Sequence, residues 1–283
     1  MNYITWEQAV QWLREQPDQQ ELVRACYYDD PLLDAAKRFS ESEEWQAVIS
    51  LLPSPGNALD IGAGRGISSY ALAVSGWQVT ALEPDPSDLV GTGAIHTLVR
   101  QTKLPINIVQ ESAEEMDFED GMFSLVYGRE VLHHAINLKE MLKRIARVLK
   151  PGGIFLACRE HVLSEKTDLD AFLKAHPLHH LYGGENAYLL DEYTTTIRDS
   201  GLRMKNIYGP YDSVINYFPV PQDELLAYIL QPVRKLIGLK LILALAKNER
   251  IKKMFFDTGL SRLASQRDHT PGRLFTFVAM KSP

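Results

Sequence analysis

The sequence predicts an α/β fold in which a largely parallel sheet is covered by helices on both faces. Between Asn57 and Glu160, short apolar segments typical of strands alternate with segments whose apolar residues recur at helical spacing. Glycine and proline clusters such as "LKPGG" separate them. Strand–helix repetition at this pitch requires crossover connections, which place the strands parallel in one sheet. Ligands of such sheets bind beyond the carboxyl-terminal strand ends.

The elements can be placed in order along the chain. Residues 1–52 read as helices, and the breaker-rich segment 51–57 precedes the first strand. A helix is expected from Asn137, since Leu138, Met141 and Ile145 share one helical face. The expected strands are 57–62, 77–83, 106–111, 122–128, 154–160, 203–209 and 272–281. The expected organisation is an N-terminal helical cap (1–52), a Rossmann-like core (53–210), a helical insertion before the last strand (211–271) and the closing strand of the core (272–283).

Composition excludes several classes of protein. The 283 residues suffice for one large α/β domain with insertions, and a formal net charge of −6 does not favour nucleic-acid binding. Cys26 and Cys158 are the only cysteines, so a disulfide-rich secreted fold is excluded and a reducing, cytoplasmic location is expected. No basic segment leads into an apolar run at the N-terminus, so no signal peptide is expected. No stretch reaches the roughly 18 apolar residues of a spanning helix.

The glycine-rich segment "LDIGAGRG" begins within the first predicted strand. Its glycines, Gly62, Gly64 and Gly66, have the spacing G-x-G-x-G, whereas a dinucleotide-binding loop has G-x-G-x-x-G. Asp60 precedes the first glycine by two residues, where its carboxylate would repel a pyrophosphate. A ligand with a positively charged amino group suits this acid, and the glycines let a bulky ligand lie against bare backbone.

A second acid, Glu83, ends the next predicted strand. An acid in this place accepts hydrogen bonds from both ribose hydroxyls of an adenosine and disfavours a 2′-phosphate. The expected ligand therefore has a cationic amino group at one end and a ribose at the other. S-adenosylmethionine has both groups and is the expected cofactor.

With these residues in place, the sequence resembles the class I S-adenosylmethionine-dependent methyltransferases, in their ubiquinone-methyltransferase-like (type 11) branch, over residues 59–160. "LDIGAGRG" resembles the first cofactor motif, and "ESAEEMDFEDGMFSLVYGREVLHH" is similar to the third and fourth motifs. The resemblance implies a seven-stranded sheet that closes with an antiparallel strand, "RLFTFVAMK". It also implies methyl transfer to a small-molecule acceptor by in-line displacement.

The resemblance further implies which residues contact the cofactor. Ser112 and Ala113 stand where the branch usually has an Asp-Ala pair against the adenine, so a hydroxyl replaces the carboxylate. Arg129 is placed beside the methionine end. Tyr28 belongs to a segment, "CYYDDP", that resembles an N-terminal lid, with ordinary interface packing as the alternative. The implied cofactor-binding residues are Asp60, Gly62, Ala63, Gly64, Gly66, Glu83, Ser112, Ala113, Arg129 and Tyr28.

His133 and His134, after the fourth predicted strand, are the candidate catalytic residues. A neutral imidazole is able to deprotonate a hydroxyl or phenol acceptor, but a base is needed only if the acceptor loses its proton early. The alternative is that one histidine packs and the other caps the helix that begins at Asn137.

A second group of histidines lies in "HPLHHLYGGE". His176, His179 and His180 have helical spacing, but Pro177 interrupts them and no cysteine or acid completes a firm ligand set. The segment is therefore expected to be a surface or acceptor-side loop, and no metal site is expected.

Residues 233–253 are unusually basic for this chain, and their leucines and isoleucines nearly encircle a helix. The segment could lie on a membrane, form a homodimer contact, or act as a lid over a hydrophobic or anionic acceptor; a helix that completes the core or forms a homodimer contact is favoured over peripheral membrane contact. The cations are Arg234, Lys235, Lys240, Lys247, Arg250, Lys252 and Lys253, against one acid, Glu249.

Two other functions remain open. A protein that binds S-adenosylmethionine without transferring a methyl group would keep the same pocket. A nicotinamide-dependent oxidoreductase is disfavoured, because Ile67 stands where its loop needs a third glycine. A nucleic-acid substrate is not expected, because "YGRE" stands in place of an Asn-Pro-Pro-Tyr-like base-flipping motif.

Overall fold

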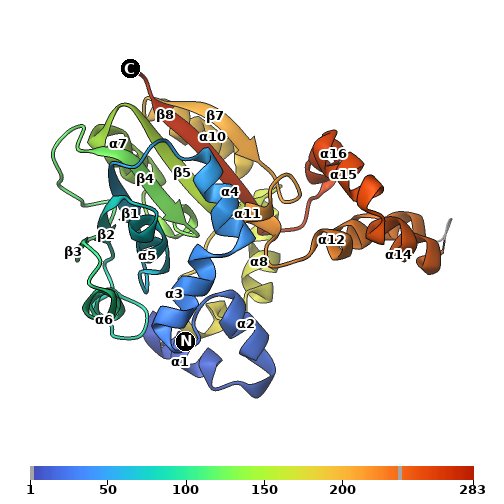
Figure 1. Ribbon diagram of the computed structural model, residues 1–283, viewed down its shortest axis with the longest axis horizontal. Helices are drawn as coiled ribbons and strands as arrows, with labels where there is room; N and C mark the ends of the chain where they lie inside the picture. Colours follow the sequence, from blue (N-terminus) through green and yellow to red (C-terminus); the bar gives the residue numbers. More distant parts are fainter. Residues whose placement is uncertain (1–2, 235–237) are drawn as a thin grey trace.

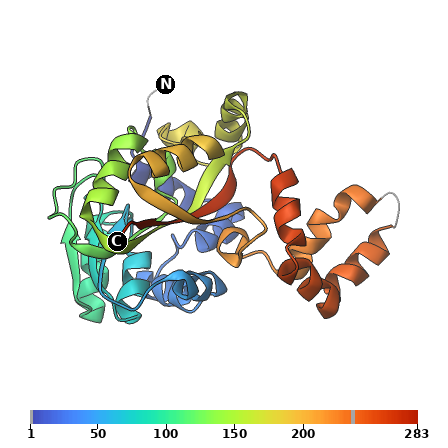
Figure 2. The ribbon, with the colours of Figure 1, turned by 90° about the horizontal axis from the view of Figure 1, so that it is seen from above.

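A computed structural model describes residues 3–234 and 238–283. Its centre is one sheet of eight strands with helices on both faces (Figures 1 and 2). The strand order is β3-β2-β1-β4-β5-β8-β7, and β6 pairs with β5 beside this path. The strands are β1 (Asn57–Ile61), β2 (Gln78–Leu82), β3 (Ile106–Val109), β4 (Phe123–Arg129), β5 (Leu149–Leu163), β6 (Tyr188–Leu189), β7 (Leu202–Tyr208) and β8 (Arg273–Lys281).

The direction of the strands follows the prediction, but their number does not. β8 is antiparallel to β5 and β7, whereas the other pairs are parallel, so the predicted closing strand is confirmed. The prediction of seven strands was wrong by one. The end of β5 runs past its pairing with β4, and Val162 and Leu163 pair there with the two-residue strand β6. A strand of two residues is too short to show an alternating pattern in the sequence.

Different helices cover the two faces of the sheet, and the buried side chains on each face form a separate hydrophobic cluster. Val126 of β4 packs in the cluster of α7 (Leu138–Val148) and α10 (Leu190–Asp199). Its neighbour Tyr127 points to the opposite face, because successive strand residues alternate. That face is covered by α3 (Leu32–Ser40), α4 (Glu43–Leu51), α5 (Ile67–Val74) and α6 (Thr92–Thr102).

The helix predicted from Asn137 is α7. The side chain of Asn137 accepts a hydrogen bond from the Glu140 backbone N–H at 3.1 Å, which satisfies one of the free amide groups at the helix start. Neither His133 nor His134 caps this helix.

Short N-terminal helices pack over the carboxyl-terminal edge of the sheet. α1 (Trp6–Arg14) begins at a capping box between Thr5 and Gln8, and η1 (Pro17–Gln19) and α2 (Gln20–Ala25) follow. Apolar residues of α1 and α2 pack with Val90 and with Leu178, which precedes α9 (His179–Tyr182). The remaining elements before β6 are η2 (Leu132–His134), η3 (Lys166–Asp168) and α8 (Leu169–Ala175).

Between β7 and β8 the chain forms helices that extend away from the sheet (Figures 1 and 2). Ile242 and Ala246 of α14 pack against Leu226 and Ala227 of α12 in a small core of their own. Lys235 of the basic segment lies outside the described residues. The four-part division of the chain stays a prediction. The elements are α11 (Val214–Tyr217), α12 (Gln222–Ile229), η4 (Gln231–Val233), α14 (Leu239–Lys247), α15 (Glu249–Asp257) and α16 (Leu260–Arg267).

Among the described residues, none of the helices combines the length and the apolar character needed to cross a membrane.

Candidate functional site

The ends of β1, β2 and β4 lie side by side at one edge of the sheet. Ile61, the last residue of β1, is in register with Leu82 of β2 and with Gly128 of β4. The residues that follow these three positions are Gly62, Glu83 and Arg129. The fold therefore brings together side chains that the sequence separates by up to 67 residues, as the parallel topology predicts.

The turn after β1 is built on left-handed glycines. Gly62, Gly64 and Gly66 have φ angles of 58°, 52° and 81°, which residues with a Cβ rarely adopt. A Cβ added to Gly62 would lie 2.3 Å from Cγ2 of Val131, so this position also has no space for a side chain. Ala63 is buried in the turn, and its N–H donates to the Leu82 carbonyl at 3.1 Å. The turn is thus fixed tightly against the neighbouring strand.

Asp60, at the end of β1, is a buried acid without a cationic partner among the described residues. It is 1% exposed, and the Ser69 hydroxyl on α5 donates to its Oδ2 at 2.6 Å. Burial raises the pKa of Asp60 to about 7, with the nearby Glu83 adding to the effect. A cationic group brought next to this carboxyl would favour its ionised form.

Glu83 follows β2 and is hydrogen-bonded to the glycine turn. Its Oε2 accepts from the Gly64 N–H at 2.7 Å, and its Oε1 accepts from the Asp85 N–H at 2.9 Å. Burial raises the pKa of Glu83, while these two bonds lower it. A carboxylate has about four acceptor positions, so about two remain for a diol.

Arg129, at the end of β4, is paired with an acid that no sequence motif marks. Its Nε and Nη2 donate to the two carboxylate oxygens of Glu44 on α4, at 2.7 and 3.2 Å. Glu44 is fully buried on the face of α4 that carries Trp45 and Val48, whereas its neighbour Glu43 is exposed. The contact between Arg129 and the methionine end of a cofactor stays a prediction.

The remaining predicted cofactor residues lie in loops. Tyr28 is half-buried and lies edge-on to Trp6 of α1, with ring centroids 6.2 Å apart, and burial raises the pKa of its phenol. Ser112 lies in the turn after β3, where its Oγ accepts from the Glu114 N–H at 3.2 Å. Ala113 beside it is buried. Their contacts with the adenine also stay predictions.

Arg65, within the glycine turn, contacts the N-terminal segment. Its buried guanidinium donates to the carbonyls of Tyr27 and Asp29 at 2.9 and 3.1 Å, and to Asp30 Oδ1 at 2.8 Å. The turn and the segment 27–30 are therefore joined. The motif contains Arg65, but the sequence pattern gives this residue no role, because its partners are carbonyls of a distant segment.

His133 is held by Glu160 of β5. The carboxylate of Glu160 is fully buried and accepts from the backbone N–H groups of Val131, Leu132 and His133 at 3.1–3.2 Å. Its Oε2 also lies 2.8 Å from Nδ1 of His133. Burial raises the pKa of Glu160 to about 7 and lowers that of His133 well below its usual value. His133 is thus packed and oriented, whereas the side chain of His134 is 39% exposed.

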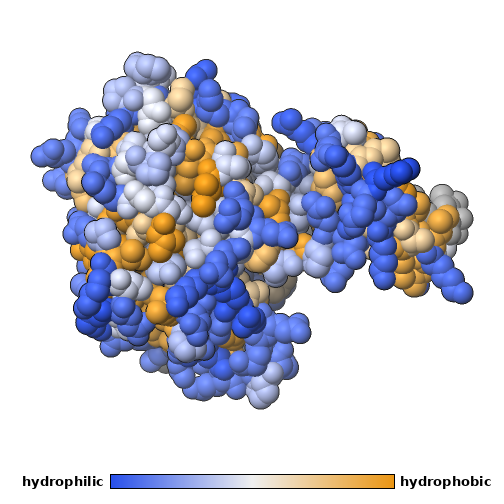
Figure 3. Space-filling view, viewed as in Figure 1, coloured by the Kyte–Doolittle hydropathy of each residue, from blue (hydrophilic) through white to orange (hydrophobic). Residues whose placement is uncertain are grey.

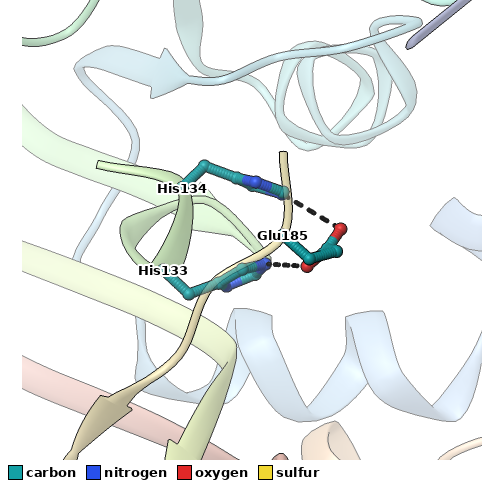
Figure 4. Close-up of side chains that lie close together, drawn as sticks. All are labelled: His133, His134 and Glu185. Atoms are coloured by element: carbon teal, nitrogen blue, oxygen red, sulfur yellow. Dashed lines mark ion pairs between the residues drawn. The ribbon is translucent and has the colours of Figure 1, made fainter. Parts of the chain in front are cut away.

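Glu185 lies between these histidines, from the loop between α9 and β6 (Figure 4). Its carboxylate oxygens are 3.8 Å from Nε2 of His133 and 3.9 Å from Nε2 of His134. His176 Nε2 lies 3.5 Å from Oε1. The segment "HPLHHLYGGE" thus contributes His176 and Glu185 to this cluster, and the other two histidines come from the turn after β4.

Parts of this chain are similar to known methyltransferases. Residues 59–157 match the model of a family described as a methyltransferase domain (Methyltransf_11). An uncharacterized methyltransferase of Mycobacterium sp. (strain JLS) is 30% identical over 167 residues, which are 58% of this chain and 59% of the relative. A ubiquinone biosynthesis O-methyltransferase of Pseudomonas paraeruginosa (strain DSM 24068 / PA7) is 29% identical over 62% of this chain and 78% of its own length.

Among solved structures, phosphoethanolamine N-methyltransferase 2 of Haemonchus contortus, in complex with S-adenosyl-L-methionine, shares the fold. The TM-score is 0.54 at 17% identity, over 93% of this chain and 60% of that one.

Residues 59–157 are therefore similar to the methyltransferase domains of the type 11 family. S-adenosylmethionine is the cofactor of such domains, as the two strand-end acids predicted. This chain spans 59% of the length of the mycobacterial relative, so the activity of the whole protein is a separate question.

Proposed function

We propose that this chain transfers a methyl group from S-adenosylmethionine to a small-molecule acceptor. The observation that carries the proposal is the pair of buried acids, Asp60 and Glu83, at the ends of adjacent strands with a left-handed glycine turn beside them. One acid suits an ammonium and the other suits a ribose diol, which are the two ends of this cofactor.

The residues present fit that cofactor. Asp60 is a buried acid that has acceptor positions left beyond its bond from Ser69, and these suit an ammonium. Glu83 likewise retains acceptor positions beyond its two bonds from backbone N–H groups. The glycine turn offers backbone without side chains, which allows close approach of a bulky group. Bound S-adenosylmethionine supplies an activated methyl group on a sulfonium.

The acceptor side is assigned to the turn after β4. His133 is oriented by Glu160 and is packed, while His134 on the same turn is partly exposed to solvent. We infer that an acceptor reaches His134 rather than His133, and that Nε2 of His133 lies deeper in the protein than His134. Either imidazole takes a proton only if the acceptor must lose one before transfer.

Labelled-methyl transfer tests this function directly. Tag-free protein is incubated with S-adenosylmethionine carrying an isotopic methyl label and with fractionated metabolite extracts, and label in an extract compound supports the proposal. Thermal shifts with S-adenosylmethionine and with NAD, measured in parallel, separate a methyltransferase from an oxidoreductase. Cofactor binding with no label transfer across all extracts would favour a binding protein that performs no transfer.

The helices that extend from the sheet are the proposed partner surface, and we infer that a second copy of the chain covers it. Leu239, Leu241 and Leu243 of α14 are 40–47% exposed, whereas Ile242 packs inward. Hydrophobic side chains also gather toward the far end of this region in Figure 3. Apolar surface of this kind usually marks an interface. Sedimentation of wild type and Leu241→Asp tests it; a monomeric wild type that binds anionic vesicles would replace this partner with lipid.

A cytoplasmic location is also proposed. It is supported by Cys26 and Cys158, which are both free thiols in the structure.

A further inference from the structure

Glu185 is an almost fully buried carboxylate with an unsatisfied oxygen. Its side chain is 3% exposed, and Oε1 accepts a hydrogen bond from the Tyr182 hydroxyl. Oε2 has no hydrogen-bond partner among the described residues. A buried carboxylate oxygen without a hydrogen-bond partner is costly unless a cation or a donor reaches it.

The imidazole of His133, whose Nε2 lies 3.8 Å from Oε2, does not supply that donor. All four contacts to the carboxylate of Glu160 come from groups that can donate: three backbone N–H groups and Nδ1 of His133. The proton of the neutral His133 ring therefore sits on Nδ1, and Nε2 carries a lone pair. That lone pair lies 3.8 Å from Oε2 of Glu185, so two acceptors face each other with no hydrogen between them.

We propose that His133, His134 and Glu185 bind a divalent transition-metal ion. Their ligand atoms all lie within 4.8 Å of one another. A tetrahedral ion with bonds of about 2.0–2.1 Å separates its ligands by about 3.3 Å. Glu185 therefore has to approach each histidine by about 0.5 Å, and the widest separation in the cluster, up to 4.8 Å, has to close by up to about 1.5 Å. Figure 4 shows both histidines on one turn with Glu185 opposite them, and His134 is the partly exposed member of the set.

The surroundings of the cluster match those of metal ligands. A metal-binding histidine typically donates its other ring N–H to a carboxylate, and His133 does so to Glu160. Two histidines and one carboxylate, with an open side, form a set used for catalytic zinc and for non-haem iron. Glu160 is therefore a positioning residue for the site.

The place of the cluster gives the ion a role that rests on the proposed function. It lies on the turn after β4, at the same strand edge as Asp60 and Glu83. A metal ion there would bind an acceptor oxygen and lower the pKa of a hydroxyl or phenol, and the two histidines would then act as ligands rather than as bases. The acceptor class that follows is an oxygen nucleophile able to coordinate a metal.

Metal titration tests the site independently of activity. Tag-free protein is stripped with a chelator and titrated with Co²⁺, whose visible absorption reports coordination, and with Zn²⁺ by calorimetry. We expect one ion per chain in the wild type. Glu185→Gln and His134→Ala should weaken Zn²⁺ binding at least about tenfold, and Glu160→Gln by about 10–100-fold.

His180→Ala is the matched control, because His180 belongs to the same segment but is exposed and packs edge-on to Trp12. It should leave metal affinity unchanged. Thermal shift with S-adenosylmethionine confirms that each variant is folded. Absence of Co²⁺ absorption in wild type, or unchanged Zn²⁺ affinity in Glu185→Gln, would overturn the metal site. Those results would leave the proposed function standing if cofactor binding persisted.

Discussion

The backbone N–H of Gly64 donates a hydrogen bond to Oε2 of Glu83 across 2.7 Å. This bond joins the turn after β1 to the acid after β2, so the two parts of the cofactor site are positioned by each other. Glu83 thus has two tasks, since it fixes the turn and presents its remaining lone pairs to a ligand.

Replacing Glu83 should therefore weaken cofactor binding strongly. Glu83→Ala removes charge-assisted hydrogen bonds of about 1.5–3 kcal/mol, which corresponds to roughly ten- to a hundredfold in Kd for S-adenosylmethionine. Isothermal calorimetry measures the change, with the exposed acid Glu119 replaced by alanine as control. An affinity in Glu83→Ala equal to that of Glu119→Ala would refute the assignment of Glu83.

Cofactor affinity should depend on pH through Asp60. Burial raises the pKa of this carboxyl to about 7, so it is largely protonated below that pH in the free protein. An ammonium favours the carboxylate, hence binding releases a proton and the affinity falls as pH drops below about 7, approaching tenfold per unit. Calorimetry between about pH 5.5 and 8 measures the slope. Asp60→Asn should bind more weakly and with a flatter profile; an identical slope would assign the dependence to another group.

The ion pair between Glu44 and Arg129 should matter for stability. Glu44→Gln leaves a buried guanidinium without its bidentate partner, and breaking a buried pair in this way costs about 3–5 kcal/mol. Glu130, 3.3 Å from Arg129, compensates in part, so a value near the lower end is expected. Urea unfolding measures it. The double variant Glu44→Leu/Arg129→Met should be more stable than Glu44→Gln, and a loss in Glu44→Gln below about 0.5 kcal/mol would mean that the pair contributes little.

A comparison of two left-handed glycines distinguishes the cost of backbone strain from the cost of a steric clash. Gly62 and Gly201 have φ angles of 58° and 93°, but an added Cβ meets Val131 within 2.3 Å at Gly62 and nothing within 4 Å at Gly201. Gly201→Ala should cost about 1–2 kcal/mol from backbone conformation alone. Gly62→Ala should cost about 1–3 kcal/mol more through overpacking.

The double variant Gly62→Ala/Val131→Ala tests the source of that difference by thermal and urea unfolding. The double variant should regain part of the stability lost in Gly62→Ala, because the Cγ2 atom that the added Cβ would meet has been removed. Equal destabilisation of Gly62→Ala and Gly201→Ala would show that the turn yields to the extra carbon.

Elements with a local signal could be predicted from the sequence. The strand β1, the glycine turn and the start of α7 at Asn137 each depend on residues within a few positions of one another, and each lies where predicted. The carboxyl ends of parallel strands lie at one edge of a sheet, so the sequence alone is enough to place Gly62, Glu83 and Arg129 at that edge, although it does not give the order of the strands.

Contacts between distant segments could not be predicted in this way. Glu44 and Arg129 are separated by 85 residues, and Glu160 and His133 by 27, with no periodicity that links either pair. Glu185 stands out only once folding brings the turn after β4 to it. The two-residue strand β6 forms because β5 leaves an unpaired edge there, which is a tertiary effect.

Arg65 has a consequence for any attempt to exchange parts of this protein. Its guanidinium donates from Nη1 to the carbonyls of Tyr27 and Asp29 and from Nη2 to the Asp30 carboxylate, all in the N-terminal segment. A chimera that carries the first helices of another methyltransferase on this core would leave that guanidinium without hydrogen-bond acceptors, unless the new segment supplied equivalent ones. The N-terminal segment and the glycine turn therefore depend on each other, and a redesign of one requires a redesign of the other.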